Sequence, residues 1–382
     1  MPLRVGLVAG ESSGDLLAAG LIDAIRARDP DAVFEGVAGP KMIAAGCEAW
    51  ADSETLAVMG LIEPLRHLPE LIGLRRSLIR RWWQTPPDVF VGVDAPDFNL
   101  GLEIALKKKG IRTMHYVSPS VWAWRKRRIR KIQKAADCVL CILPFEPAVY
   151  ADKGIDAVFV GHPRASSLST DIDINSARDF LQLPVDSRVV AVLPGSRRSE
   201  VTRLGPVFAA AAARIAVSDE RIRFVTPIAS PQLRPLIERY LLDAGIQDRF
   251  ALVDGESERA MAASDVVLLA SGTAALESAL LCKPTVAAYQ VAALTYSILY
   301  WFNMVDVPHF TLPNLLTEKP LVPEFIQRDA TPDAIADEVT AMLNDPDRCA
   351  GISATFAKLK SELALDANER AADALFSLVT QE

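Results

Sequence analysis

The sequence predicts an α/β protein with two Rossmann-like, doubly wound parallel-sheet domains that face a cleft. Short apolar strands alternate with helical segments along most of the chain, which is typical of parallel sheets. The alternation stops at a polar stretch, residues 164–174, and then restarts. The chain has 382 residues, too many for one ordinary core. We therefore predict domains at 1–164 and 165–352, followed by a C-terminal helical segment, 353–382, that packs back on the first domain.

Composition limits the class of protein. Hydrophobic residues make up 50% of the sequence and charged residues 23%, as in globular proteins. The net charge of −7 argues against a general nucleic-acid-binding protein. Five scattered cysteines and the absence of a secretory signal lead us to expect reduced thiols and a cytoplasmic location.

The first strand, residues 3–10, runs into the loop Gly-Glu-Ser-Ser-Gly-Asp at 10–15. A helix is expected after it, from about Leu16. The glycine spacing does not fit the dinucleotide-binding fingerprint, so nucleotide binding here has weak support. The polar residues of the loop are nevertheless candidate site residues, because they follow a strand of a parallel sheet. They are Glu11, Ser12 and Asp15.

In residues 61–83, leucine and isoleucine recur at helical spacing, interrupted by Pro64 and Pro69, and then alternate with arginines before Trp82 and Trp83. A basic amphipathic helix with terminal tryptophans is typical of a membrane surface. The alternative is a helix on the domain surface with a solvated basic face. The sequence leaves both interpretations open.

The next strand, Val89–Val93, is followed by Asp94 and Asp97. In an open α/β sheet, sites form at the carboxyl ends of the strands, so both carboxylates are candidate acid–base groups. Alternatively, Asp97 or Asn99 caps the next helix. A further strand, residues 111–117, leads to the basic run 125–131, which suits phosphates or anionic lipid headgroups better than nucleic acid in so acidic a chain.

The second domain restarts with a strand, Val189–Leu193, followed by Pro-Gly-Ser-Arg at 194–197. Arg197 follows a tight turn, where its guanidinium is suited to a diphosphate. A second candidate is the segment 265–281, where a buried strand meets a helix at Ser271-Gly272-Thr273. Free backbone N–H groups at such a junction suit a diphosphate, and Glu277 lies one turn further on, where it could accept hydrogen bonds from a ribose. The alternative is an ordinary capped turn.

Residues 284–305 carry no charge, but polar residues interrupt them. We therefore expect a strand and then an apolar, non-spanning helix from about Ala292. This helix and residues 61–83 are each expected to contact either the membrane or a second subunit. Contact with a second subunit would make the protein a homodimer. Residues 311–316 are expected to be a loop that presents Asn314, and one long helix is expected from about Ala354 to Thr380.

Eight motifs, in this order, resemble lipid-A-disaccharide synthase and together cover about residues 3–330. They are GESSGD at 10–15, VDAPDFN at 93–99, HYVSPSVWAWR at 115–125, LPFE at 143–146, GHP at 161–163, LPGSR at 193–197, ASGTAALE at 270–277 and LPNLL at 312–316. This family is a GT-B glycosyltransferase family. The resemblance implies inverting transfer of 2,3-diacylglucosamine from UDP-2,3-diacylglucosamine to 2,3-diacylglucosamine 1-phosphate, with release of UDP, at the inner face of the inner membrane.

The resemblance also implies roles for single residues. Asp94, or Asp97 in its place, would be the base. The donor would be bound by Ser196 and Arg197 at the diphosphate, by Ser271, Gly272 and Thr273 at the helix end, by Glu277 at the ribose, and by Asn314. Two positions depart from the family pattern: Ser12 replaces a commoner alanine, and Gln290 replaces an expected basic residue, which puts a donor contact there in doubt.

No cofactor or metal is expected, because the four histidines are scattered and no acidic pair adjoins the diphosphate loops. Two alternatives remain. A UDP-N-acetylglucosamine 2-epimerase-like enzyme has the same architecture but acts on a soluble sugar. A non-catalytic two-domain binding protein would carry an export signal.

Overall fold

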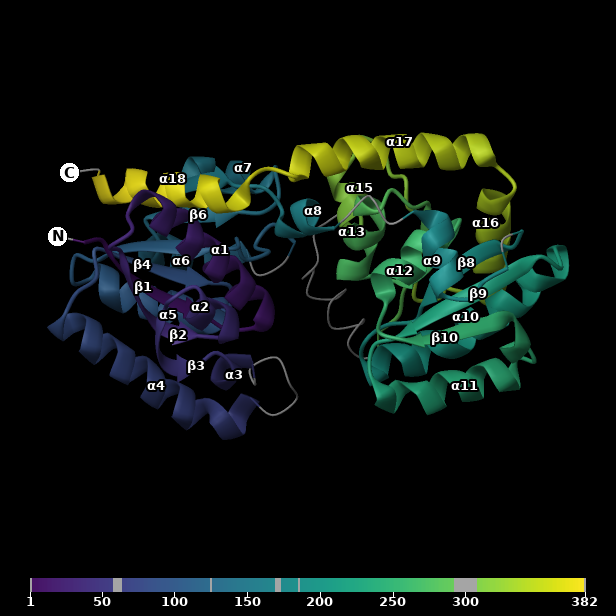
Figure 1. Cartoon of the computed structure of the whole chain (residues 1–382), viewed down its shortest axis with the longest axis horizontal. Coiled ribbons are helices and arrows are strands. Elements are labelled where there is room, and N and C mark those ends of the chain that lie inside the picture. The colour runs from purple at the N-terminus through teal and green to yellow at the C-terminus, as the bar shows by residue number, and fades with distance from the viewer. Residues whose placement is uncertain are drawn as a thin grey trace. The chain divides into compact units, whose positions relative to one another are not determined.

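The computed structural model of the protein divides into two compact units, Met1–Pro163 with Leu363–Glu382, and Arg164–Glu362 (Figure 1). Each unit contains one parallel sheet, which confirms the predicted α/β class with two doubly wound sheets. The structure describes residues 2–57, 64–123, 126–168, 173–184, 186–291 and 308–380. The predicted apolar helix from Ala292 lies outside these residues.

Seven parallel strands form the first sheet, in the order β3-β2-β1-β4-β5-β6-β7. Their bounds are β1 Arg4–Ala9, β2 Val33–Ala38, β3 Glu48–Asp52, β4 Val89–Val93, β5 Arg112–Tyr116, β6 Cys138–Cys141 and β7 Asp156–Phe159. The sequence analysis missed β3, because this short edge strand is acidic and pairs only with β2. The strand order reverses between β1 and β4, so a topological switch point lies at their carboxyl ends.

Helices cover both faces of the first sheet. They are α1 Ser12–Arg28, α2 Pro40–Ala44, α3 Glu54–Ala57, α4 Pro64–Gln84, α5 Pro96–Lys107, α6 Ile129–Ala135, α7 Glu146–Tyr150 and α18 Ala367–Thr380. Three hydrophobic clusters form in this unit: one between the sheet and helices α1 and α18, one between the sheet and helices α4 and α5, and one between β6 and helices α5, α6 and α7. Figure 1 shows α18 along α1, where Arg28 forms ion pairs with Glu369 at 2.5 Å and Asp373 at 2.6 Å.

The end of the chain differs from the prediction of one helix from about Ala354. It forms two helices, α17 Pro346–Leu363 and α18. The break has a local cause: the Asp366 carboxylate accepts a hydrogen bond from the Glu369 N–H at 3.2 Å and caps the first turn of α18. The predicted boundary at 352/353 falls inside α17, and the division between the units instead precedes Leu363.

Six parallel strands form the second sheet, in the order β10-β9-β8-β11-β12-β13. Their bounds are β8 Arg188–Leu193, β9 Ile222–Ile228, β10 Phe250–Asp254, β11 Val266–Ala270, β12 Thr285–Tyr289 and β13 Glu324–Ile326. The order reverses between β8 and β11, so the second switch point lies at the carboxyl ends of these strands.

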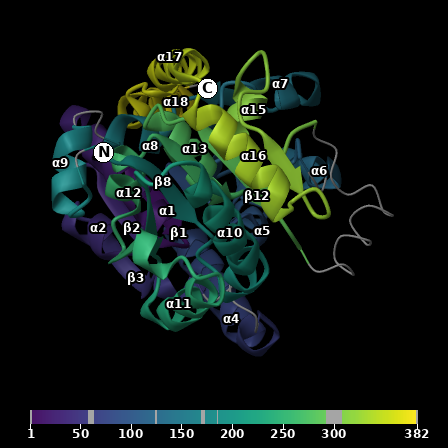
Figure 2. The same cartoon turned by 90° about the vertical axis from the view of Figure 1, so that its right-hand side faces the viewer.

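The helices of the second unit include α16, which packs along α10 and can be followed in Figure 2. The helices are α8 Pro163–Ser167 at the boundary, α9 Ile174–Phe180, α10 Arg198–Ser218, α11 Arg234–Asp243, α12 Ser257–Ala263, α13 Thr273–Leu280, α15 Leu312–Leu316, α16 Pro332–Leu343 and α17. Within the described part of the chain, one helix, α10, is long and apolar enough to span a membrane, and half of its apolar window is buried in the unit.

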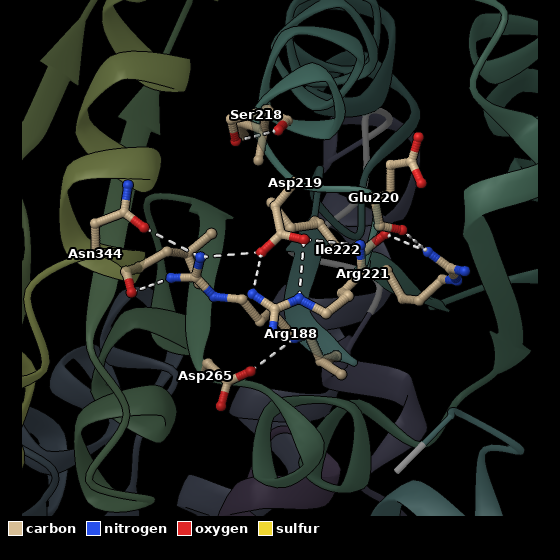
Figure 3. Close-up of polar contacts among 12 residues, drawn as sticks. Arg188, Ser218, Asp219, Glu220, Arg221, Ile222, Asp265 and Asn344 are labelled. Atoms are coloured by element: carbon tan, nitrogen blue, oxygen red, sulfur yellow. Dashed lines mark hydrogen bonds and ion pairs between the residues drawn. The ribbon is translucent and has the colours of Figure 1, made fainter. Parts of the chain in front are cut away.

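Figure 3 shows a polar cluster at the amino end of β8, opposite the switch point. Arg188 donates hydrogen bonds to the Asn344 side chain at 3.1 Å, to the Asp219 carboxylate at 3.4 Å and to the Leu343 carbonyl. Arg221 also pairs with Asp219 at 2.8 Å, and these hydrogen bonds hold the pKa of Asp219 well below its usual value. The cluster joins the ends of α10 and α16 to the start of the sheet.

Helix α4 faces its own unit with its apolar side. Leu71, Leu78 and Trp82 are buried, and the Trp82 N–H donates a hydrogen bond to Glu35 at 3.2 Å. Trp83 is 47% exposed. The two terminal tryptophans therefore do not form one membrane-facing pair, because consecutive residues of an α-helix point about 100° apart.

Candidate functional site

The first candidate site lies at the switch point of the first unit, where the loops after β1 and β4 touch. A Cβ atom at Gly10 would lie 2.7 Å from the Cβ of Ala95, so glycine permits this close approach. Asp94 and Ala95 have φ values of +51° and +41°, in the left-handed region. Val117, after the neighbouring strand β5, has a φ of +76°. Such values are uncommon for non-glycine residues and often occur at functional sites.

Asn99 holds the backbone that carries Asp94. Its buried side-chain amide donates to the carbonyl oxygens of Asp94 at 2.9 Å, Val93 at 3.3 Å and Val8 at 3.4 Å. The Asp94 N–H in turn donates to the Tyr116 carbonyl at 2.8 Å. These bonds tie the turn to β1, β4 and β5 and fix the direction in which the Asp94 side chain leaves the sheet.

Asp94 lines a pocket of about 180 Å³ at the ends of β4 and β5. The other lining residues are Pro96, Val117, Ser118, Pro119, Ser120, Val121 and Arg128. Asp97 has a different environment: its carboxylate forms an ion pair with Arg128 at 2.5 Å and is 58% exposed. Of the two predicted bases, only Asp94 lines this pocket.

Residues 118–121 form one wall of the pocket, and Glu146 holds the loop that carries them through the next residue, Trp122. This buried carboxylate accepts hydrogen bonds from the Trp122 indole at 3.2 Å, from the Ile142 N–H at 3.1 Å and from the Leu143 N–H at 3.0 Å. It therefore joins the loop after β5 to the loop after β6. Burial raises the pKa of Glu146 to about 7, although these hydrogen bonds lower it.

The three candidate residues of the loop 10–15, Glu11, Ser12 and Asp15, differ in their exposure to solvent. The helix α1 begins at Ser12 rather than at about Leu16, so most of the loop is its first turn. Glu11 and Ser12 are exposed beside the switch point. Asp15 is buried, and its carboxylate accepts hydrogen bonds from the backbone N–H groups of Gly39, Lys41 and Met42. Asp15 thus caps α2, and we assign it a structural role.

In the second unit, the loop after β8 folds around Glu200. One oxygen of the Glu200 carboxylate accepts hydrogen bonds from the backbone N–H groups of Ser196 at 3.1 Å and Arg197 at 3.2 Å. The Arg197 side chain is 80% exposed and lies 3.5 Å from the other oxygen. The two backbone N–H groups are therefore occupied in this structure, whereas the guanidinium is accessible to an anion.

The loop after β11 places the amino end of α13 at the same edge of the sheet. Gly272 is the N-cap residue, and no side chain caps the helix. Gly272 and Thr273 are exposed, and no atom lies within 4 Å of a Cβ built on Gly272. The Ser271 hydroxyl donates to the Phe310 carbonyl at 3.4 Å. An uncapped amino end beside an exposed arginine is suited to a diphosphate.

Glu277 lies one turn into α13 and is paired. One of its carboxylate oxygens accepts a hydrogen bond from Nε of Arg164 at 3.2 Å. The same oxygen forms an ion pair with a terminal nitrogen of this guanidinium at 3.1 Å. The Glu277 side chain remains 25% exposed. Arg164 orients this carboxylate and occupies one of its two oxygens.

Asn314 lies in α15, not in the predicted loop. Its amide nitrogen donates to the Val322 carbonyl at 2.7 Å and to Glu324 at 3.0 Å, and its oxygen accepts from the N–H groups of Leu321 and Val322 at 2.8 Å. The side chain is buried and its hydrogen-bonding capacity is used within the unit. A donor contact by Asn314 therefore requires one of these bonds to be exchanged. Gln290 similarly donates to the Gln327 carbonyl at 3.1 Å.

The sequence analysis assigned no individual role to Arg128, Glu146 or Arg164, and it considered Arg128 only as part of the phosphate- or lipid-binding run 125–131. Arg128 was one of several equivalent basic residues, Glu146 ended a motif, LPFE, without an obvious chemistry, and Arg164 fell in the predicted linker. Their partners are distant in the sequence, so no local pattern reveals them. Among the described residues, no group of histidine, cysteine, aspartate and glutamate side chains is arranged to hold a metal ion.

A family model described as lipid-A-disaccharide synthetase matches residues 5–378. A lipid-A-disaccharide synthase from Xanthomonas campestris pv. campestris (strain 8004) is 47% identical over 379 residues, which cover 99% of this chain and 86% of the relative. The enzyme of the same name from Pseudomonas syringae pv. tomato is 46% identical over 380 residues, with coverages of 99% and 98%. The enzyme from Cellvibrio japonicus is 45% identical over 377 residues, with coverages of 99% and 97%.

Solved structures share the fold at low sequence identity. A UDP-N-acetylglucosamine 2-epimerase from Neisseria meningitidis, bound to UDP-GlcNAc, matches with a TM-score of 0.63 and 12% identity over 98% of this chain and 100% of its own. A glycosyltransferase from Rickettsia africae matches with a TM-score of 0.63 and 9% identity, with coverages of 100% and 99%. These likenesses show the fold alone.

Proposed function

The chain belongs to the lipid-A-disaccharide synthase family, and on this premise we propose the following division of work between its two units. The enzyme transfers 2,3-diacylglucosamine from UDP-2,3-diacylglucosamine to 2,3-diacylglucosamine 1-phosphate and releases UDP. The second unit binds the UDP donor, and the first unit binds the acceptor and supplies the base.

One observation carries the donor assignment: the exposed guanidinium of Arg197 and the uncapped amino end of α13 follow β8 and β11, the neighbouring strands at the switch point. A diphosphate binds there through charge-assisted hydrogen bonds to the guanidinium and to N–H groups of the first helical turn. The Glu277 oxygen that Arg164 does not occupy accepts a hydrogen bond from the ribose. The same positive groups stabilise the charge that develops on UDP as it leaves.

Asp94 acts as the general base in the proposed mechanism. It accepts the proton of the acceptor 6-hydroxyl while that oxygen attacks the anomeric carbon of the donor. The C–O bond to UDP breaks as the new C–O bond forms, so this single displacement inverts the centre and gives a β-1,6 linkage. The assignment is supported by the place of Asp94 in the pocket and by the ion pair that engages Asp97. No step requires a metal.

The acylated substrates point to a membrane surface. We place the enzyme on the cytoplasmic face of the inner membrane, in contact through the outer side of α4. Leu68 is 46% and Trp83 47% exposed there, and Arg76 and Arg80 are also exposed. Each arginine near an anionic surface contributes about 1 kcal/mol. A subunit interface is the competing use of this surface.

The test is UDP release from UDP-2,3-diacylglucosamine, measured with and without 2,3-diacylglucosamine 1-phosphate. Release that requires the acceptor, with formation of the disaccharide, is the expected result. Turnover of a soluble UDP-sugar without an acceptor would instead indicate the 2-epimerase-like alternative. Binding of UDP without any turnover would indicate a binding protein.

A further inference from the structure

One basic residue near the pocket differs from its neighbours. Arg127 and Arg130 are exposed, whereas the side chain of Arg128 is only 15% exposed and lines the pocket that contains Asp94. Arg128 reaches this position from the turn before α6, and Asp94 from the end of β4. The pocket is therefore lined by an acidic residue, Asp94, and a basic one, Arg128, together with Ser118 and Ser120, and the Ser118 hydroxyl is paired with the Tyr150 hydroxyl at 2.8 Å.

We propose that Arg128 is the recognition residue for the phosphate monoester of the acceptor. This inference rests on the proposed function, in which Asp94 takes the proton of the 6-hydroxyl. In a hexose 1-phosphate, the ring oxygen joins C1, which carries the phosphate, to C5, which carries the CH2OH group with the 6-hydroxyl. They lie along the same edge of the sugar, so one small pocket can hold both. A guanidinium recognises phosphate oxygens through two parallel hydrogen bonds.

The ion pair between Arg128 and Asp97 does not prevent this use. The Asp97 side chain is 58% exposed, so it can return to water at low cost, and a pair with an exposed partner contributes little free energy. A phosphate monoester carries a charge of about −1.5 to −2 at pH 7 and has three acceptor oxygens. It is therefore a stronger partner for the guanidinium than a single carboxylate.

Charged side chains of both signs act on Lys131, which lies three positions after Arg128. Burial lowers the pKa of Lys131, on the next turn of the chain, and the charges of Arg128 and Arg75 lower it further, whereas Asp97 and Glu103 raise it.

The experiment compares two acceptors, 2,3-diacylglucosamine with and without its 1-phosphate, in micelles of a nonionic detergent so that no phospholipid phosphate competes. Arg128→Gln should lower kcat/KM for the phosphorylated acceptor by about 10- to 100-fold, the range for a lost charge-assisted hydrogen bond. It should change kcat/KM for the dephosphorylated acceptor much less. Arg128→Lys should recover part of the loss, because it restores the charge but not the two-pronged geometry.

Lys134→Gln is the matched control, because Lys134 is an exposed cation near the end of α6, away from the pocket. It should leave the preference for the phosphorylated acceptor at the wild-type level. An equal fall of kcat/KM for both acceptors in Arg128→Gln would instead show that Arg128 only supports the loop, and an unchanged preference would also overturn the proposal.

A binding measurement separates this inference from the proposed function. Glucosamine 1-phosphate and glucosamine are titrated into the wild-type protein and Arg128→Gln, with binding followed by NMR. Weaker binding of glucosamine 1-phosphate alone to the variant supports the inference even if the wild type transfers no sugar. Equal binding of the phosphate by both proteins would contradict it even if the transferase assay succeeds.

Discussion

At the scale of single residues, environment distinguishes side chains of the same type. Asp94 and Asp97 are three positions apart in one motif, yet only Asp94 lines the pocket, on a turn that Asn99 and Tyr116 hold in a left-handed conformation. Asp97 pairs with Arg128 instead. The mechanism therefore depends on backbone geometry as much as on the carboxyl group.

Asp94→Ala should lower kcat by about 10²- to 10⁴-fold, the usual contribution of a general base. Binding of UDP should be unchanged, because the variant leaves the second unit intact. Asp97→Ala should lower kcat far less. Steady-state transferase kinetics and UDP titration calorimetry check both variants, and near-normal turnover of Asp94→Ala would remove Asp94 from the mechanism.

Glu146 gives the stability of the protein a pH dependence with a defined sign. Burial raises its pKa from 4.5 to about 7, so the folded protein binds the proton more tightly than the unfolded chain does. The resulting stabilisation is fully present below about pH 4.5 and is lost as the pH rises through about 7.

Glutamine stays neutral at every pH, so the variant Glu146→Gln does not lose this stabilisation. The unfolding free energy of the variant minus that of the wild type should therefore rise by on the order of 2–3 kcal/mol as the pH is raised from 5 to 8. Urea denaturation at both pH values measures this difference. A difference in unfolding free energy that does not vary with pH would show that the pKa of Glu146 is not raised in the folded protein.

At the scale of elements, one side of α4 packs into the hydrophobic core of the first unit and the other side faces solvent. Gly6 of β1 leaves room for Trp82, since a Cβ there would lie 3.0 Å from the indole ring. The ring also packs against Trp50 and Phe90, with centroids 5.2 Å and 5.1 Å away. Trp83 instead packs against Lys109, whose ammonium lies 4.7 Å from the ring centroid.

The two tryptophans make a matched pair of variants. Trp82→Ala should lower the free energy of unfolding by about 3–5 kcal/mol, because it empties a buried volume and leaves Glu35 without one donor. Trp83→Ala should change stability by roughly 0.5 kcal/mol or less, as is usual for surface positions. Denaturant titration of both variants is the measurement, and equal losses would contradict the burial of Trp82.

The outer side of α4 provides a second element-scale prediction. The double variant Arg76→Gln/Arg80→Gln should lower the free energy of binding to anionic vesicles by about 2 kcal/mol, because each charge contributes about 1 kcal/mol. Co-sedimentation with vesicles of anionic and of neutral lipid measures this effect. Binding that ignores both lipid charge and salt would exclude the electrostatic contact.

At the scale of the whole molecule, the two units repeat one architecture and are proposed to serve different substrates. Each sheet has its candidate groups at the switch point, but the first unit offers a carboxylate in a pocket and the second offers an arginine and a helix amino end. This asymmetry supports one unit for the acceptor and one for the donor.

Such a mechanism needs no metal ion, because Arg197 and the amino end of α13 supply the positive charge at the diphosphate. Transferase activity should therefore stay at its full level in excess chelator, and added Mg²⁺ or Mn²⁺ should not raise it. Activity that is lost in chelator and restored by a divalent cation would refute this mechanism.

Much of this molecule follows from local patterns in its chain. Apolar strand segments predicted both parallel sheets, and the ordered motifs identified the family and the loops around Asp94, Arg197 and Gly272. These features depend on neighbouring residues, so the sequence determines them directly. The edge strands β3 and β13 were missed because so few residues form them.

The contacts that assign roles were decided only by the folded structure. Arg128 meets Asp97, Arg164 meets Glu277, and Trp82 meets Glu35, across 31, 113 and 47 positions of the chain. No periodicity or motif spacing encodes such pairs, because they depend on how strands and helices stack. Asn314 shows the same limit: its motif suggests a ligand contact, whereas packing directs all of its hydrogen bonds into the protein.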